Sequence, residues 1–144
     1  MTSVPAWMAF ALGSAFFAGA TAVLAKLGVV GINSNLATFV RTSVVLLVCA
    51  GIVSARGEWV WPEQGFRMRP LAFLLLSGVA TGLSWLCYFR ALQLAPVSVV
   101  APIDKLSVVF AIMLGIVVLG EPVTWRLALG SALIVGGALV IASG

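Results

Sequence analysis

An acid and a base stand side by side in an apolar stretch in the C-terminal half of the chain. Asp104 and Lys105 interrupt residues 96–121, whose other side chains are nearly all apolar or small. Ionised groups at membrane depth are costly, and those that occur serve substrate or ion pathways, proton relays or helix pairing. The pair is therefore a candidate for binding a charged solute, and Asp104 is the candidate for carrying a coupled proton.

Other polar and aromatic side chains lie in neighbouring apolar stretches. Arg41 is suited to an anionic group, and Trp85 and Tyr88 offer aromatic faces that can line a binding site. Lys26 and Arg90 lie nearer the ends of their stretches, where long basic side chains extend toward water. We expect the first three residues in a binding site and the last two at its mouth or gate.

Pro102 marks a second feature of the stretch that holds the charged pair. A proline beyond the first turn of a helix lacks the N–H donor and crowds the preceding turn. The carbonyl left without a donor needs water or a substrate group, and interrupted helices near intramembrane charges recur at transporter binding sites. We therefore expect Pro102 at the mouth or gate as well. The alternative is an ordinary proline kink with no part in binding.

The composition shows that these residues lie in a membrane protein. Hydrophobic residues make up 62% of the chain and charged residues 8%, so the four acidic and eight basic side chains are too few to cover a soluble domain. We read the net charge of +4 as a determinant of membrane topology, not of nucleic-acid binding. The chain has no histidine, and both cysteines lie in apolar runs, so no metal site, cofactor or enzymatic centre is expected.

Apolar runs of the length that a bilayer requires predict an all-α, polytopic protein with five transmembrane helices. One membrane domain is expected to fill residues 1–144, with a charged, tryptophan-containing loop at 56–69 on the membrane surface. The predicted spans cover residues 7–30, 34–55, 70–94, 97–119 and 125–143.

An odd number of spans places the two termini on opposite sides, here called side A for the N-terminus and side B for the C-terminus. Side B then carries two basic residues, Lys26 and Arg90, and side A carries four, at positions 56, 67, 69 and 126. Positively charged loops favour the cytoplasm, so side A is predicted to be cytoplasmic. The excess is small enough to leave a dual orientation open.

The candidate residues are predicted to lie at a similar depth in the membrane. Arg41 lies seven residues inside the second span and Asp104 seven inside the fourth, and both spans enter from side B. A rise of about 1.5 Å per residue places both at a depth of about 10 Å, and the third-span aromatics fall nearby. We therefore predict a polar cavity open to side B. The alternative is that Arg41 and Asp104 form a buried pair that only fixes helix register.

Small residues indicate how the helices pack in lipid. Gly78 and Gly82 form a G-x-x-x-G ridge on the third span, and Ala132 and Gly136 repeat the small-residue spacing on the fifth. Such ridges let helix backbones approach closely. We expect them to be close helix contacts.

Four segments, residues 88–96, 99–102, 115–122 and 130–137, resemble the EamA domain of the drug/metabolite transporter superfamily. The most specific parts are the Leu-Gly-Glu turn that ends at Glu121 and the glycine-framed Ala-Leu-Ile of the fifth span. Arg41 and Lys26 fit the same pattern, so the resemblance covers essentially the whole chain.

The resemblance implies a fold, a function and a partner. Most members of that superfamily have two inverted five-span repeats around a substrate cavity, whereas this chain supplies one repeat and is expected to form a homodimer or a heterodimer with a paralogue. The fifth span is similar to the pairing helix of small multidrug resistance proteins, which makes Gly130, Gly136 and Gly137 candidates for the dimer contact. Those proteins exchange protons for cationic drugs through a glutamate in the first span, and no acid is present there in this chain.

The leading hypothesis is a secondary transporter in a bacterial or archaeal cytoplasmic membrane, surrounded by lipid and moving a small metabolite or drug-like solute by alternating access. Two bases against one acid in the candidate site favour an anionic or zwitterionic solute. The alternative hypothesis is a non-transporting assembly partner, or an accessory subunit of a lipid carrier, in which the charged cluster is structural.

Overall fold

The chain is all-helical in the part that the structure describes, with no β-strand among those residues. The structure, a computed structural model, describes residues 5–60, 62, 65 and 67–144. Five helical segments in these residues are long and apolar enough to cross a membrane: Ala6–Gly28, Ser34–Ala55, Met68–Leu94, Val97–Leu119 and Trp125–Ala142. The predicted all-α fold with five transmembrane helices is confirmed.

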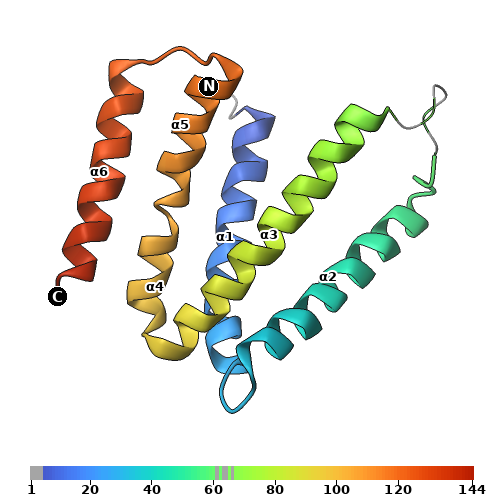
Figure 1. Cartoon of the computed structure of the whole chain (residues 1–144), viewed down its shortest axis with the longest axis horizontal. Coiled ribbons are helices and arrows are strands. Elements are labelled where there is room, and N and C mark those ends of the chain that lie inside the picture. Colours follow the sequence, from blue (N-terminus) through green and yellow to red (C-terminus); the bar gives the residue numbers. More distant parts are fainter. Residues whose placement is uncertain (1–4, 61, 63–64, 66) are drawn as a thin grey trace. The chain divides into compact units, whose positions relative to one another are not determined.

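Two compact units make up the chain. One unit, here the terminal unit, comprises residues 1–26 and 94–144, and the other, the central unit, comprises residues 27–93. Helix α1 (Ala6–Gly28) lies almost wholly in the terminal unit, with α4 (Val97–Asp104), α5 (Ser107–Leu119) and α6 (Trp125–Ala142). The central unit is built from α2 (Ser34–Ala55) and α3 (Met68–Leu94), as Figure 1 shows.

The helix boundaries of the central unit follow from capping and turn residues. Gly31 has a φ of 73°, which suits glycine in the turn before α2. The side chain of Asn33 then caps α2 by accepting a hydrogen bond from the backbone N–H of Asn35 at 2.9 Å. The connection from α2 to α3 includes residues 61, 63, 64 and 66, which lie outside the described residues, so its predicted position on the membrane surface stays a prediction.

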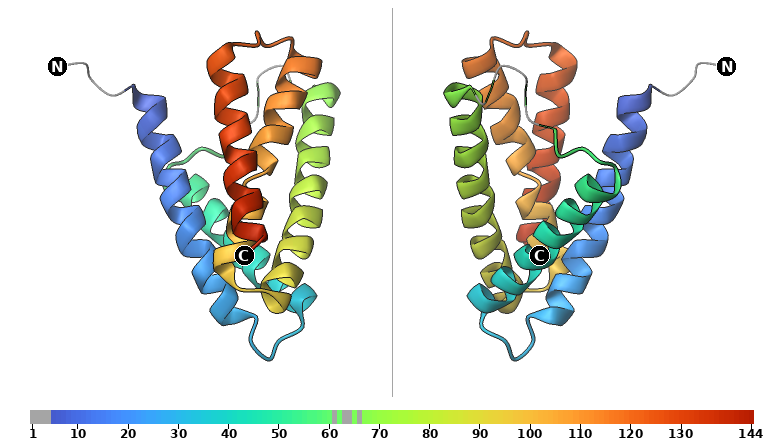
Figure 2. Two further views of the ribbon diagram at one scale, coloured as in Figure 1. Left: turned by 90° about the vertical axis from the view of Figure 1, so that its left-hand side faces the viewer. Right: turned by 90° about the vertical axis from the view of Figure 1, so that its right-hand side faces the viewer.

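The terminal unit owes its α5–α6 turn to the Leu-Gly-Glu sequence. Gly120 adopts the left-handed conformation that ends α5, with a φ of 72°. The Glu121 side chain then folds over Gly115, where a Cβ would lie 2.8 Å from Glu121 Oε2. Thr124 caps α6 by accepting from the N–H of Leu127 at 3.2 Å. Helix α6 packs against α4 and α5, and Figure 2 shows α5 and α6 side by side.

A short turn divides the fourth predicted span into α4 and α5. The N–H groups of Lys105 and Leu106 donate to carbonyls three residues back, at 3.1 and 3.0 Å, so one tight turn replaces the α-helical pattern. Pro102 has no N–H for the carbonyl of Ser98, which weakens the helix just before this turn. The sequence predicted a distortion at the proline, and the structure places the interruption three residues later.

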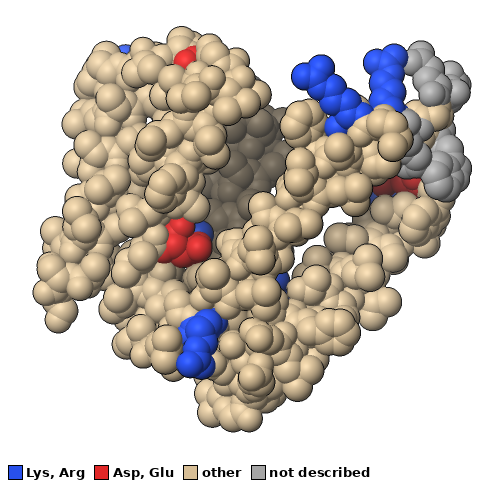
Figure 3. All heavy atoms as spheres, viewed as in Figure 1, with Lys and Arg blue, Asp and Glu red and all other residues tan. Residues whose placement is uncertain are grey.

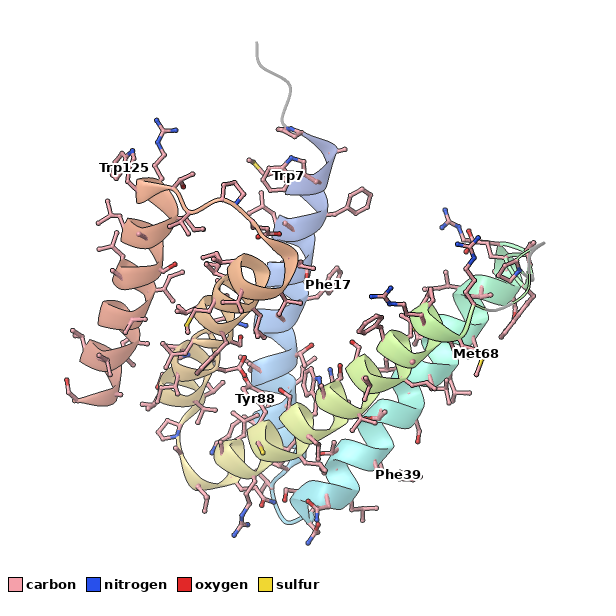
Figure 4. The ribbon with its side chains drawn as sticks, turned by 45° about the horizontal axis from the view of Figure 1, so that its top comes forward. Trp7, Phe17, Phe39, Met68, Tyr88 and Trp125 are labelled. Carbon is pink, nitrogen blue, oxygen red and sulfur yellow. The ribbon has the colours of Figure 1, made fainter. Side chains whose placement is uncertain are left out.

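The molecular surface has the character of a membrane protein. Nearly the whole face seen in Figure 3 is uncharged. In the terminal unit, Trp7 and Trp125 lie at the N-terminal ends of α1 and α6 and are 67% and 71% exposed (Figure 4). Tryptophan is enriched at membrane–water interfaces. The chain is therefore an integral, multi-pass membrane protein.

Candidate functional site

Arg41 and the third-span aromatics come together within the central unit. The guanidinium carbon of Arg41 lies 3.2 Å from the centroid of the Trp85 ring, which is a close cation–π contact. Trp85 in turn meets Tyr88 edge to face, with ring centroids 5.8 Å apart and an angle of 77° between planes. The structure thus brings together three of the five residues predicted to bind substrate or couple its movement.

Phe89, which was not among the predicted site residues, belongs to this cluster. Its ring centroid lies 6.0 Å from that of Trp85 and 6.0 Å from the guanidinium carbon of Arg41, and its side chain is buried. The spacing of four residues from Trp85 was a usable signal, because such residues share one face of a helix. Phe89 therefore packs beside the Trp85 ring that Arg41 contacts.

A cavity of about 490 Å³ opens beside Arg41, between α2 and α3. Its polar lining comes from Arg41, Thr42, Ser77 and Thr81, and the rest of the wall is formed by Val45, Leu74, Gly78, Gly82 and Trp85. Volumes in this range are typical of small-molecule sites. This space is here called the α2–α3 cavity.

The glycine ridge on α3 lines this cavity and does not contact α2 closely, and its predicted role in close helix contacts stays a prediction. A Cβ built at either position would meet no atom within 4 Å outside the local backbone of α3, among the described residues. The absence of side chains at both positions keeps the wall of the cavity open. In the central unit, the two glycines of the G-x-x-x-G motif leave space beside Arg41.

Asp104 and Lys105 lie in the terminal unit, at the junction of α4 and α5. Lys105 Nζ is 3.6 Å from Asp104 Oδ2, and their side chains are 56% and 37% exposed. Lys105 also occupies the C-terminal end of α4, where the helix dipole favours a positive charge. The two residues therefore neutralise each other locally. That they line one cavity together with Arg41 stays a prediction.

Lys105 and Pro102 line a second, open groove of about 450 Å³ between α4 and α6. Gly137 of α6 lies on the same groove. A Cβ at Gly130, Gly136 or Gly137 would meet nothing within 4 Å among the described residues. These three glycines thus leave free space along α6, and their predicted role in a dimer contact stays a prediction.

The basic residues predicted at the mouth make specific hydrogen bonds at helix ends. In the terminal unit, Lys26 Nζ donates to the carbonyl of Ala95 at 2.9 Å. In the central unit, Arg90 donates to Gln93 Oε1 at 3.0 Å. Gln93 Nε2 donates in turn to the carbonyls of Ile32 and Val29, at 2.7 and 3.5 Å.

Gln93 is the second functional candidate that the sequence analysis did not select. It ties the connection between α1 and α2 to the last turn of α3, and it orients Arg90. A single glutamine at a helix end carries no pattern that distinguishes it from a solvated residue, so this role could not be inferred from the sequence. A gating role for Lys26 and Arg90 stays a prediction.

Removing the amide of Gln93 should loosen this connection. We expect Gln93→Leu to lower the free energy of unfolding by about 0.5–1.5 kcal/mol, because the amide donor to the carbonyl of Ile32 is lost. The loss is measured as a lower melting temperature in detergent micelles. Gln93→Glu keeps the acceptor for Arg90 and removes the donor, so it should lose most of the same stability. An unchanged melting temperature in both variants would show that the donor bond contributes nothing.

The chain is similar in sequence to proteins that are named transporters. Residues 5–143 match the EamA-like transporter family. An uncharacterized transporter in the cobO 3′ region of Sinorhizobium sp is 51% identical over 136 residues, which cover 94% of this chain and 96% of that protein. No solved structure gives a significant match.

A second relative is named as part of a flippase. The probable 4-amino-4-deoxy-L-arabinose-phosphoundecaprenol flippase subunit ArnE of Enterobacter sp. (strain 638) is 30% identical over 102 residues, which cover 69% of this chain and 95% of that protein. The family match spans nearly all of the sequence, and it includes every residue of both candidate clusters. The chain belongs to the EamA-like transporter family and has a membrane-transport role.

Proposed function

We propose that the chain is one repeat of a secondary transporter, which moves a small metabolite or drug-like solute by alternating access as an antiparallel pair. The observation that carries the proposal is the cation of Arg41 at the wall of a small-molecule-sized cavity between two membrane-spanning helices. A purely structural arginine has no need of an open cavity beside it. Charged side chains inside spans mark substrate or ion pathways in most membrane proteins that have them.

The lengths of the relatives support pairing of single repeats. The two relatives are matched over 96% and 95% of their own lengths, so the first is about as long as this chain and the second is shorter. One is named a transporter and the other a flippase subunit. Proteins no longer than this chain therefore carry transport-related names, and we propose that a second chain supplies the other half of the cavity.

Five residues are proposed to form the transport site, with distinct roles. Arg41 binds the solute beside the aromatic faces of Trp85 and Tyr88. Asp104 exchanges the coupled proton, and Lys105 lies beside it as its ion-pair partner when the site is empty. The turn between α4 and α5 allows the helix to move, because it replaces α-helical hydrogen bonds with a short, tight segment.

An accessory role is the second candidate function. The flippase subunit among the relatives favours it, since a subunit need not carry the transport site itself. In that case the chain would assemble with a lipid carrier, and the Arg41 and Asp104 clusters would serve stability alone.

Transport itself is tested with the purified protein in liposomes. Vesicles with an imposed proton gradient are incubated in a bacterial metabolite extract, and their contents are identified by mass spectrometry. The proposal expects one solute or chemical class to accumulate in vesicles that contain the protein, and not in empty vesicles. Equal contents in both sets, with and without the gradient, would favour the accessory role.

Reporter fusions test the antiparallel arrangement. Two reporters are fused at Gly144, one that is active only in the cytoplasm and one that is active only outside it. We expect both fusions to give a signal. A fusion in the turn at Gly31 lies on the same side of the membrane in the five-span topology and serves as the matched control. A single, fixed location at both positions would exclude an antiparallel homodimer.

A further inference from the structure

We propose that the α2–α3 cavity binds an anionic oxygen group, a carboxylate or a phosphate, through the guanidinium of Arg41. The inference rests on the proposed function, because it names the chemical class of the solute that the transport site accepts. The binding itself is a property of the central unit and is measurable without transport.

The charge of Arg41 has no carboxylate on either wall of its own cavity. Neither α2 nor α3 contains an aspartate or a glutamate. The acid at the α4–α5 junction, Asp104, is already paired with Lys105. Within the described residues, no oxygen accepts a hydrogen bond from the Arg41 side chain. A guanidinium at membrane depth without an anionic partner is costly, so the site is suited to an anion supplied by a ligand.

The contact with Trp85 serves as the partner of Arg41 when the cavity is empty. A cation–π contact contributes about 0.5–2 kcal/mol, whereas each hydrogen bond to a charged group contributes about 1.5–3 kcal/mol. It also uses none of the N–H donors, which remain available for a carboxylate or phosphate in a two-point geometry. An arriving anion can therefore bind Arg41 in preference to the indole ring.

The remaining walls of the cavity fit a small anion with an apolar part. The hydroxyl groups of Thr42 and Thr81 donate to backbone carbonyls of their own helices, each at 2.8 Å. The Ser77 hydroxyl makes no hydrogen bond among the described residues and is available to a ligand. Val45 and Leu74 cover the apolar part of the wall, and the two glycines leave room. The same chemistry suits a soluble anion or the headgroup of an anionic lipid.

Thermal stabilisation of the purified protein tests the proposal with defined probes. The protein is held in phosphatidylcholine nanodiscs, and phenyl phosphate is added as the soluble anion. Benzyl alcohol is the neutral control and phenyltrimethylammonium is the cationic control. A parallel arm replaces part of the lipid with phosphatidic acid. We expect a concentration-dependent rise in melting temperature with at least one of the two anions, and none with the neutral or cationic probe. The arm that responds identifies the source of the anionic group.

Variants show whether Arg41 is responsible. Arg41→Gln should weaken the apparent affinity for the anion about tenfold or more, since it removes charge-assisted hydrogen bonds. Arg41→Lys should retain part of it, and Arg126→Gln, which removes an arginine on α6, should retain all of it. Gly78→Leu fills the cavity without changing charge and should also abolish the response. It therefore gives the answer if Arg41→Gln does not fold.

Two results would overturn the inference. One is the absence of stabilisation by either anion in the wild-type protein, and the other is equal stabilisation in wild type, Arg41→Gln and Gly78→Leu. The inference and the proposed function fail separately. Anion binding through Arg41 without movement of any solute contradicts only the transporter, whereas transport of a cation at an undiminished rate in Arg41→Gln contradicts only the anion site.

Discussion

Solute transport in proteoliposomes should fall about 10- to 100-fold when Arg41 is replaced by glutamine, because hydrogen bonds to a charged group contribute about 1.5–3 kcal/mol. Glutamine removes the charge and the two-point donor geometry and keeps a polar side chain of moderate length. The measurement is the initial rate of uptake at a solute concentration below saturation, where lost affinity appears directly in the rate.

Two control variants separate binding from general damage to the protein. Arg41→Lys keeps the charge and loses the planar donor geometry, so its uptake rate should lie between those of wild type and Arg41→Gln. Arg126→Gln removes an exposed arginine at the start of α6 and should transport at the wild-type rate. An Arg41→Gln protein that folds and transports at the wild-type rate would remove Arg41 from the site.

Asp104→Asn should abolish the ability of a proton gradient to drive accumulation. Asparagine has nearly the same size as aspartate and cannot exchange a proton, so uphill transport stops while downhill exchange can continue. For one coupled proton, a gradient of one pH unit supports about tenfold accumulation of the solute. In the variant, the internal and external solute concentrations should become equal. The measurement is the ratio of internal to external solute at steady state.

Other acids serve as references for the Asp104 prediction. Asp104→Glu keeps an exchangeable carboxyl at the α4–α5 junction and should retain gradient-driven accumulation. Glu121→Gln removes an acid at the α5–α6 turn, which lies outside the proposed site, and should leave accumulation unchanged. Full gradient-driven accumulation in Asp104→Asn would exclude this carboxyl as the proton carrier.

The sequence was sufficient for the class of fold because a bilayer imposes a simple length rule. Each apolar run of the required length became one helical span, and Gly31 and Gly120 ended runs through positive-φ turns that glycine favours. The break between α4 and α5 was harder to place. Proline weakens the helix that precedes it. The position of the break, however, depends on which carbonyls accept hydrogen bonds from the N–H groups that follow the proline.

The sequence predicted the depth of the site residues in the membrane better than it predicted their contacts. Helical rise places Arg41 and Trp85 at a similar depth, but it does not determine which way each side chain points around its helix. The cation–π contact depends on the rotamer of Arg41 and on the packing of Phe89 against Trp85. Gln93 could not be predicted either, because its partners are backbone carbonyls more than sixty residues away in sequence.

Small-residue patterns were ambiguous in the same way. The spacing of Gly78 and Gly82 fits a close helix contact or an open cavity wall equally well, because both need the absence of a side chain. In this chain they line the cavity beside Arg41. Only the position of the neighbouring helix distinguishes the two outcomes, and that position is not encoded in the spacing.

The uptake rate of the double variant Arg41→Met with Asp104→Leu, reconstituted beside wild type, shows whether Arg41 and Asp104 are parts of a transport site or only structural. Apolar side chains of similar size can replace a structural pair without loss of stability. We predict a folded protein, with the wild-type oligomeric state, that no longer transports. Transport by this variant at the wild-type rate would contradict the account.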